Sequence, residues 1–113
     1  MLAALVLLLV VEFAVGAAGV CTTQDRAIWE REGHTWPHRF RDFGGALVST
    51  PSYERSVRAA TGLTEACAAC YGEAYNCGYD HCKWSCYWES DACNTCLHDE
   101  GCIERCTRCT GFS

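Results

Sequence analysis

The stretch "CAACYGEAYNCGYDHCKWSC", from Cys67 to Cys86, holds five cysteines in twenty residues. Their spacing is helical: at about 100° per residue, Cys67, Cys70 and Cys77 share one side of a helix, and so do Cys82 and Cys86. Five more cysteines follow with similar spacing: Cys93, Cys96, Cys102, Cys106 and Cys109. Gly78, the pair Ser90-Asp91 and Gly101 separate the groups, and no stretch alternates as a strand does. Three or four short helices with inward-facing cysteines are therefore predicted.

Facing stripes of cysteine on neighbouring helices suit interhelix disulfides, which need Cβ atoms about 4 Å apart. The ten spacings are roughly palindromic about residues 86–93. This symmetry predicts an antiparallel ladder with the pairs Cys67–Cys109, Cys70–Cys106, Cys77–Cys102, Cys82–Cys96 and Cys86–Cys93. Cys21 is then the unpaired candidate: it is free, pairs with another chain, or displaces one member of the ladder.

The chain has 113 residues, of which 11 are cysteine, and a net charge of −5. A chain this short forms one small domain and needs covalent cross-links to offset the entropy of folding. From Cys67 onward there are seven acidic residues against three basic ones. Nucleic acid is therefore not an expected partner.

The first twenty residues are apolar apart from Glu12. They suit either a cleaved signal peptide or a retained membrane anchor, because about 20 apolar residues span a bilayer. In a retained helix, Glu12 would face a partner protein or a cofactor. Both interpretations place the rest of the chain outside the cytosol, secreted or on the lumenal side of a membrane, where disulfides persist.

Residues 21–63 are interpreted as an N-terminal arm before the cysteine-rich module at 64–113. Thr22 and Asp25 resemble a capping box and predict a helix over 23–32. The segment between Gly33 and Gly45 is predicted to be a loop that packs through Trp36, Phe40 and Phe43. A second helix of about ten residues is predicted from Thr50-Pro51 to Gly62.

Three C-x-x-C motifs occur, at 67–70, 93–96 and 106–109. A redox enzyme would place such a motif after a strand, and none is predicted here. Helix-borne thiolates also suit Cu(I) or Zn²⁺, with His81 and His98 as added ligands. Export favours disulfides instead, so no metal site and no cofactor are expected, and both histidines are interpreted as surface residues.

Catalysis by a nucleophile needs a base, an orienting group and a pocket. His34, His38 and Asp42 lie close in sequence, but no catalytic motif accompanies them, and they are interpreted as part of a solvated loop. No catalytic residue is therefore assigned, and the chain is not expected to be an enzyme.

Trp84 and Trp88 lie about 160° around their helix from Cys86, and Tyr87 lies between them and the cysteine face. Two interpretations are open. The N-terminal arm covers these rings, or the rings are exposed and bind a partner protein, since Trp and Tyr are frequent interface anchors. They are the partner-binding candidates, together with Glu12.

The run "GLTEACAACYGE" at 62–73, with "CGYDHC", "DACNTC" and the closing "CTGF", resembles cysteine-rich modules of predicted secreted proteins from single-celled eukaryotes. The resemblance covers 62–112 and implies export and disulfides, but no activity.

The sequence thus predicts a small all-α, disulfide-rich fold, with short helices cross-linked as a hairpin or bundle after an N-terminal apolar helix. The expected function is non-enzymatic, by protein binding or structural packing. The first alternative is a membrane-anchored accessory subunit of a larger complex, with its folded part on the lumenal side. The second is Cu(I) or Zn carriage by helix-borne thiolates.

Overall fold

The structure is a computed structural model that describes residues 19–44, 48–88 and 90–112, with the side chains of His38, Trp88 and Ser90 excepted. The apolar segment 1–18, including Glu12, lies outside this range. Within the described part the fold is all-α and disulfide-rich, as predicted. None of the helices described is long and apolar enough to span a bilayer.

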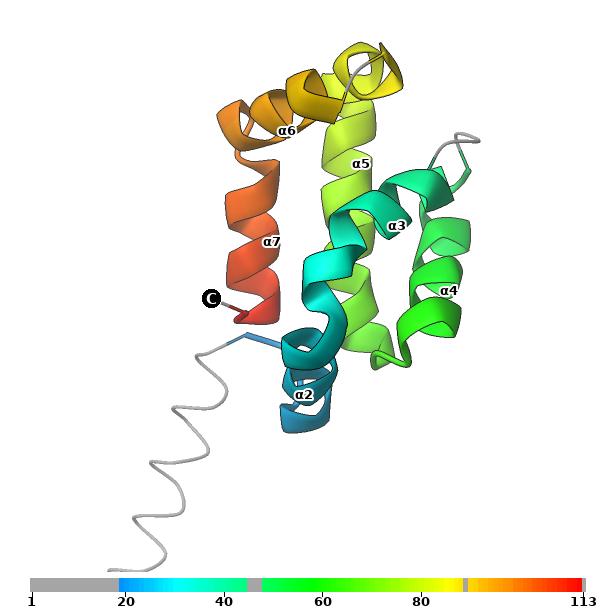
Figure 1. Ribbon diagram of the computed structural model, residues 1–113, viewed down its shortest axis with the longest axis vertical. Coiled ribbons are helices and arrows are strands. Elements are labelled where there is room, and N and C mark those ends of the chain that lie inside the picture. The colour runs from blue at the N-terminus through cyan, green and yellow to red at the C-terminus, as the bar shows by residue number, and fades with distance from the viewer. Residues whose placement is uncertain (1–18, 45–47, 89, 113) are drawn as a thin grey trace, which may run out of the picture.

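The longest helix, α5 (Glu65–Trp88), is the centre of the molecule (Figure 1). On either side of it lie α4 (Thr50–Thr61) and α7 (Cys102–Thr110), and α6 (Ser90–Asp99) crosses one end. At the other end lies α2 (Thr23–Glu32), which a short 3₁₀ turn, Gly33–Thr35, joins to α3 (Trp36–Gly44). The helical hairpin that the sequence predicts is the pair α5 and α7, closed by α6.

Local signals fix most helix ends. The capping box of Thr22 and Asp25 is present at the start of α2. The side chain of Ser49, not Thr50, caps α4, and Gly62 ends that helix in the left-handed conformation with φ of 79°. Gly101, with φ of 74°, separates α6 from α7 as predicted.

The segment predicted as a loop between Gly33 and Gly45 is largely helical, so that prediction is wrong. Trp36, Phe40 and Phe43 recur at the spacing of one helix face and pack on the core. Pro37 is the second residue of α3, where its missing N–H leaves no hydrogen bond unmade.

The break predicted at Gly78 is also wrong, because α5 runs through it as one helix. Gly78 is buried against α6, and a Cβ atom there would come within 3.0 Å of Leu97 Cδ2. The glycine therefore permits close packing of α6 rather than ending the helix.

Five disulfides cross-link the helices. Three pairs follow the predicted ladder: Cys77–Cys102, Cys82–Cys96 and Cys86–Cys93. The other two predicted pairs are wrong. Instead, the structure pairs Cys70 with Cys109 and Cys21 with Cys67, and leaves Cys106 as the free cysteine among the described residues.

The rise per residue of an α-helix explains why Cys70 pairs with Cys109 and not with Cys106. Cys70 and Cys77 are seven residues apart on α5, and Cys102 and Cys109 are seven apart on α7, about 10.5 Å in each case. Antiparallel helices therefore bring Cys109, not Cys106, opposite Cys70. Cys67 lies one turn beyond the last cysteine of α7. The segment before α2 passes there, with the Val20 N–H donating to the Cys109 carbonyl, and it supplies Cys21.

An aromatic cluster forms the core where α3, α4 and the start of α5 meet. Trp36 and Phe40 stack 5.1 Å apart, and the ring of Tyr71 meets both of them edge-on. Trp29 stacks on Phe112, so the C-terminus closes against α2. The N-terminal arm therefore packs on the first half of α5.

Candidate functional site

The second half of α5 carries an exposed group of side chains that we name the aromatic patch: Tyr79, Lys83, Trp84 and Tyr87. The side chain of Trp84 is 68% exposed and that of Tyr87 is 62% exposed. The Lys83 ammonium lies 4.7 Å from the ring centre of Tyr79 and 5.6 Å from that of Trp84, within the range of cation–π attraction. The N-terminal arm does not cover Trp84 or Tyr87, so the interpretation in which it does is wrong for these two rings. The side chain of Trp88, the third candidate, lies outside the described part.

The aromatic patch has a rigid support. Cys82 and Cys86, on the side of α5 opposite Trp84, are bonded to Cys96 and Cys93 of α6. Arg41 of α3 also donates a hydrogen bond to the Cys86 carbonyl at 3.3 Å. The backbone beneath Trp84 is therefore fixed in the free protein.

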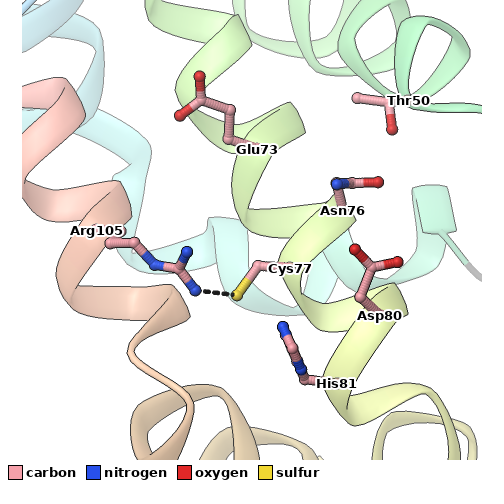
Figure 2. A pocket seen from close by; sticks show the side chains of 7 residues that line it. All are labelled: Thr50, Glu73, Asn76, Cys77, Asp80, His81 and Arg105. Atoms are coloured by element: carbon pink, nitrogen blue, oxygen red, sulfur yellow. Dashed lines mark hydrogen bonds between the residues drawn. The ribbon is translucent and has the colours of Figure 1, made fainter.

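A polar groove with a volume of about 500 Å³ opens beside α5 (Figure 2). Five of its lining residues belong to α5, while α4 and α7 supply one each: Glu73, Asn76, Cys77, Asp80, His81, Thr50 and Arg105. The Arg105 guanidinium donates to the Cys77 sulfur at 2.7 Å and to the Glu100 carbonyl at 3.3 Å. It is thereby held on the α7 side of the groove, as Figure 2 shows for its contact with Cys77.

Sequence reasoning did not select the groove residues. Glu73, Asn76 and Asp80 recur at intervals of three and four residues, which places them on one helix face. The sequence predicts a helix break at Gly78, which would place Asp80 on a different helix from Glu73 and Asn76. A continuous α5 would have revealed the stripe.

The free thiol of Cys106 is half-buried on α7, beside a cavity of about 50 Å³ shared with Glu73 and Ala74 of α5. Burial, and then the charge of Glu73, raises the pKa of this thiol to about 12. A thiol with so high a pKa is almost wholly protonated at neutral pH, which makes it a poor nucleophile.

The cysteine sulfurs are not arranged as a metal site. Cys21, Asp25 and Cys67 place their ligand atoms within 4.8 Å of one another, and in the described part they are the one group close enough to hold an ion. However, the two sulfurs are bonded to each other. Thiolate ligation there would require reduction of the disulfide.

The histidines considered as ligands lie on the surface. His81 Nδ1 is 3.9 Å from Glu100, and His98 Nδ1 is 3.1 Å from Glu104, with all four side chains about half exposed. His34 and Asp42 are also exposed, on the 3₁₀ turn and on α3. The partners of His81 and His98 in the described part are glutamates and not cysteine sulfurs.

Asp25 is the most buried charged residue described, with 1% of its surface exposed. It accepts hydrogen bonds from the backbone N–H groups of Thr22 and Thr64 and from the Thr64 hydroxyl. Burial, the largest influence, raises its pKa, but the hydrogen bonds from Thr64 and Thr22 outweigh burial, and the pKa lies below its ordinary value. Asp25 thus joins the start of α2 to the start of α5, which is a structural role.

The five disulfides are typical of a protein of an oxidising compartment. The surface features that remain for function are the aromatic patch and the groove next to it on α5. No protein-family model, no curated protein and no solved structure matches this chain.

Proposed function

We propose that the protein is a non-enzymatic binding module of an oxidising compartment, secreted or lumenal, and that its aromatic patch binds a partner protein. The observation that carries the proposal is the 68% exposure of Trp84 on a helix held by two disulfides. Burial of a large aromatic side chain contributes about 1.5–3 kcal/mol to binding. Because the backbone is already rigid, binding does not have to order it, which lowers the entropy cost of association.

Two observations support a role without catalysis. The free thiol of Cys106 has a raised pKa and so a low reactivity. The groove is open and polar, whereas a catalytic pocket brings a nucleophile, a base and an orienting group together. The alternative as a membrane-anchored subunit depends on residues 1–18, outside the described range, and metal carriage would need the disulfides reduced.

The test compares capture by three forms of the folded protein. Wild type, Trp84→Ala and Val20→Ala are immobilised with native disulfides and exposed to secreted proteins of the source organism. Val20 is the matched control because it is apolar, 52% exposed and outside α5. We expect at least one protein that wild type and Val20→Ala retain and Trp84→Ala loses.

That protein is then purified and its dissociation constant is measured. For an interface anchor we expect Trp84→Ala to raise the dissociation constant about tenfold or more. Equal retention by Trp84→Ala and wild type would refute binding through the aromatic patch. Chemical conversion of the captured protein by wild type would refute the non-enzymatic role.

A further inference from the structure

Two carboxylates of the groove, Glu73 and Asp80, differ from the acidic groups that have ion-pair partners. Glu100 and Glu104 lie beside histidines, and Glu32 lies beside Arg31 and Arg39. Glu73 and Asp80 are exposed, and their carboxylates make no hydrogen bond or ion pair with another described residue. Their charges are therefore available to a binding partner.

These carboxylates share one face of α5 with Trp84 and Tyr87 of the aromatic patch. At about 100° per residue, Glu73, Asp80, Trp84 and Tyr87 lie within about 60° of one another. From Glu73 to Tyr87 this face is about 21 Å long at 1.5 Å per residue. Acidic side chains occupy one end of this face and two exposed aromatic rings the other, so Glu73, Asp80, Trp84 and Tyr87 form one stripe along α5.

We propose that this face of α5 binds an amphipathic basic segment of a partner protein. Apolar side chains of the segment pack on Trp84, and its lysines or arginines lie over Asp80 and Glu73. The inference rests on the proposed function and names the chemistry of the partner. It is supported by the charge of the chain from Cys67 onward, with seven acidic residues against three basic ones.

The aromatic end and the acidic end of this face contribute differently to the affinity for a partner. An exposed ion pair adds only about 0.2–1 kcal/mol and is weakened by salt. Arg105 and Lys83 border the surface and reduce the attraction further, although Arg105 is turned toward Cys77. Trp84 therefore supplies most of the affinity, and the carboxylates select the sign of the partner's charge.

The test uses two synthetic peptides of about 18 residues, long enough to cover the face as a helix. Both carry the same leucine stripe, with lysines on the polar side of one and glutamates on that of the other. Fluorescence anisotropy measures their binding to wild type, Glu73→Gln/Asp80→Asn, Trp84→Ala and Glu30→Gln/Asp42→Asn. The last variant removes the same number of exposed charges from α2 and α3.

We expect wild type and the α2/α3 control to bind the lysine peptide about tenfold or more tightly than the glutamate peptide, a difference of about 1.4 kcal/mol. Glu73→Gln/Asp80→Asn should abolish most of this preference, and Trp84→Ala should weaken binding of both peptides. Added salt should reduce the preference in wild type and leave the double variant nearly unaffected.

Other outcomes overturn the inference in distinguishable ways. Equal binding of both peptides that still depends on Trp84 refutes the basic partner and leaves the proposed function standing. A preference that survives Glu73→Gln/Asp80→Asn means that other charges cause it. If neither peptide binds wild type, the basic segment is refuted, and the capture experiment with Trp84→Ala decides the proposed function independently.

Discussion

Asp25 holds two helix starts together through a single buried carboxylate. Its oxygens accept one hydrogen bond from the Thr22 backbone N–H, within the capping box of α2, and two from Thr64, next to the start of α5. A carboxylate whose pKa is lower in the folded than in the unfolded chain stabilises the fold above its unfolded pKa of about 3.9. That stability is lost as pH falls through the folded pKa.

We therefore expect the melting temperature to fall as the pH is lowered from about 4 toward 2. Asp25→Asn should lower the free energy of unfolding at pH 7 by about 2 kcal/mol and flatten the acid dependence. Thermal unfolding followed by circular dichroism measures both effects, with the exposed Asp42→Asn as control. An acid dependence that is as steep in Asp25→Asn as in wild type would contradict this role.

The observed disulfides differ from the palindromic ladder because they leave Cys106, and not Cys21, as the free cysteine. With Cys21 in a disulfide, one thiol per chain remains among the described cysteines. Since burial and Glu73 raise its pKa to about 12, it should react very slowly with a thiol reagent in the folded protein.

We expect no labelling of the folded protein at pH 7, and one label per chain after unfolding without reductant. Peptide mapping should locate this label on Cys106. Intact mass should show the loss of ten hydrogens that five disulfides require. A label on Cys21 would instead support the palindromic ladder.

At the scale of helices, the turn at Gly101 depends on backbone conformation and not on packing. An added Cβ atom would meet no atom within 4 Å, but φ is 74°. A left-handed conformation costs a residue with a side chain about 1–2 kcal/mol, and less for asparagine. Gly101→Ala should therefore destabilise the protein by about 1 kcal/mol in urea unfolding, and Gly101→Asn by less. If Gly101→Ala were as stable as wild type, the connection between α6 and α7 would not depend on a glycine in the left-handed conformation.

Local signals in the sequence predict most helices, because caps, glycines and apolar spacing act within a few residues. The capping box of α2 and the end of α4 at Gly62 are examples. The role of Gly78 does not follow from local signals, because it depends on Leu97 of α6, nineteen residues away in a helix whose position no local rule supplies.

The order of the cysteines along the chain does not predict all of the disulfide pairs. The palindrome gives the three pairs between α5 and the helices that follow it for which the partners are 25, 14 and 7 residues apart. Toward the start of α5, the pairing depends on equal rise along α5 and α7 and on the path of the segment carrying Cys21. The groove depends on the same packing, so its residues could not be chosen from sequence alone.

At the scale of the whole molecule, the two halves are stabilised by different means. The aromatic core lies around α3, α4 and the start of α5. Between Tyr71 and Cys109, the buried hydrophobic side chains in the described part of the chain are all cysteines, namely Cys77, Cys82, Cys93 and Cys102. Cross-links thus replace an apolar core in the half that carries the aromatic patch.

Because disulfides stabilise one half and an aromatic core the other, we expect local rather than global unfolding when the disulfides between α5 and α6 are removed. A variant with alanine at Cys82, Cys96, Cys86 and Cys93 loses two disulfides, each contributing about 2–3 kcal/mol in the chain-entropy model. Hydrogen exchange measured by mass spectrometry should show rapid exchange in α6 and the last turns of α5. Amides of α4, which lies on the aromatic core, should stay protected.

The control removes a disulfide from the opposite half, with alanine at Cys21 and Cys67. It should loosen the segment before α2 and leave α6 protected, because Cys82–Cys96 and Cys86–Cys93 remain. If both variants exchanged uniformly along the chain, the two halves would be one cooperative unit. Selective opening of α6 would instead mean that the surface around Trp84 keeps its shape only while the nearby disulfides are intact, so a reducing environment would end binding before it unfolds the aromatic core.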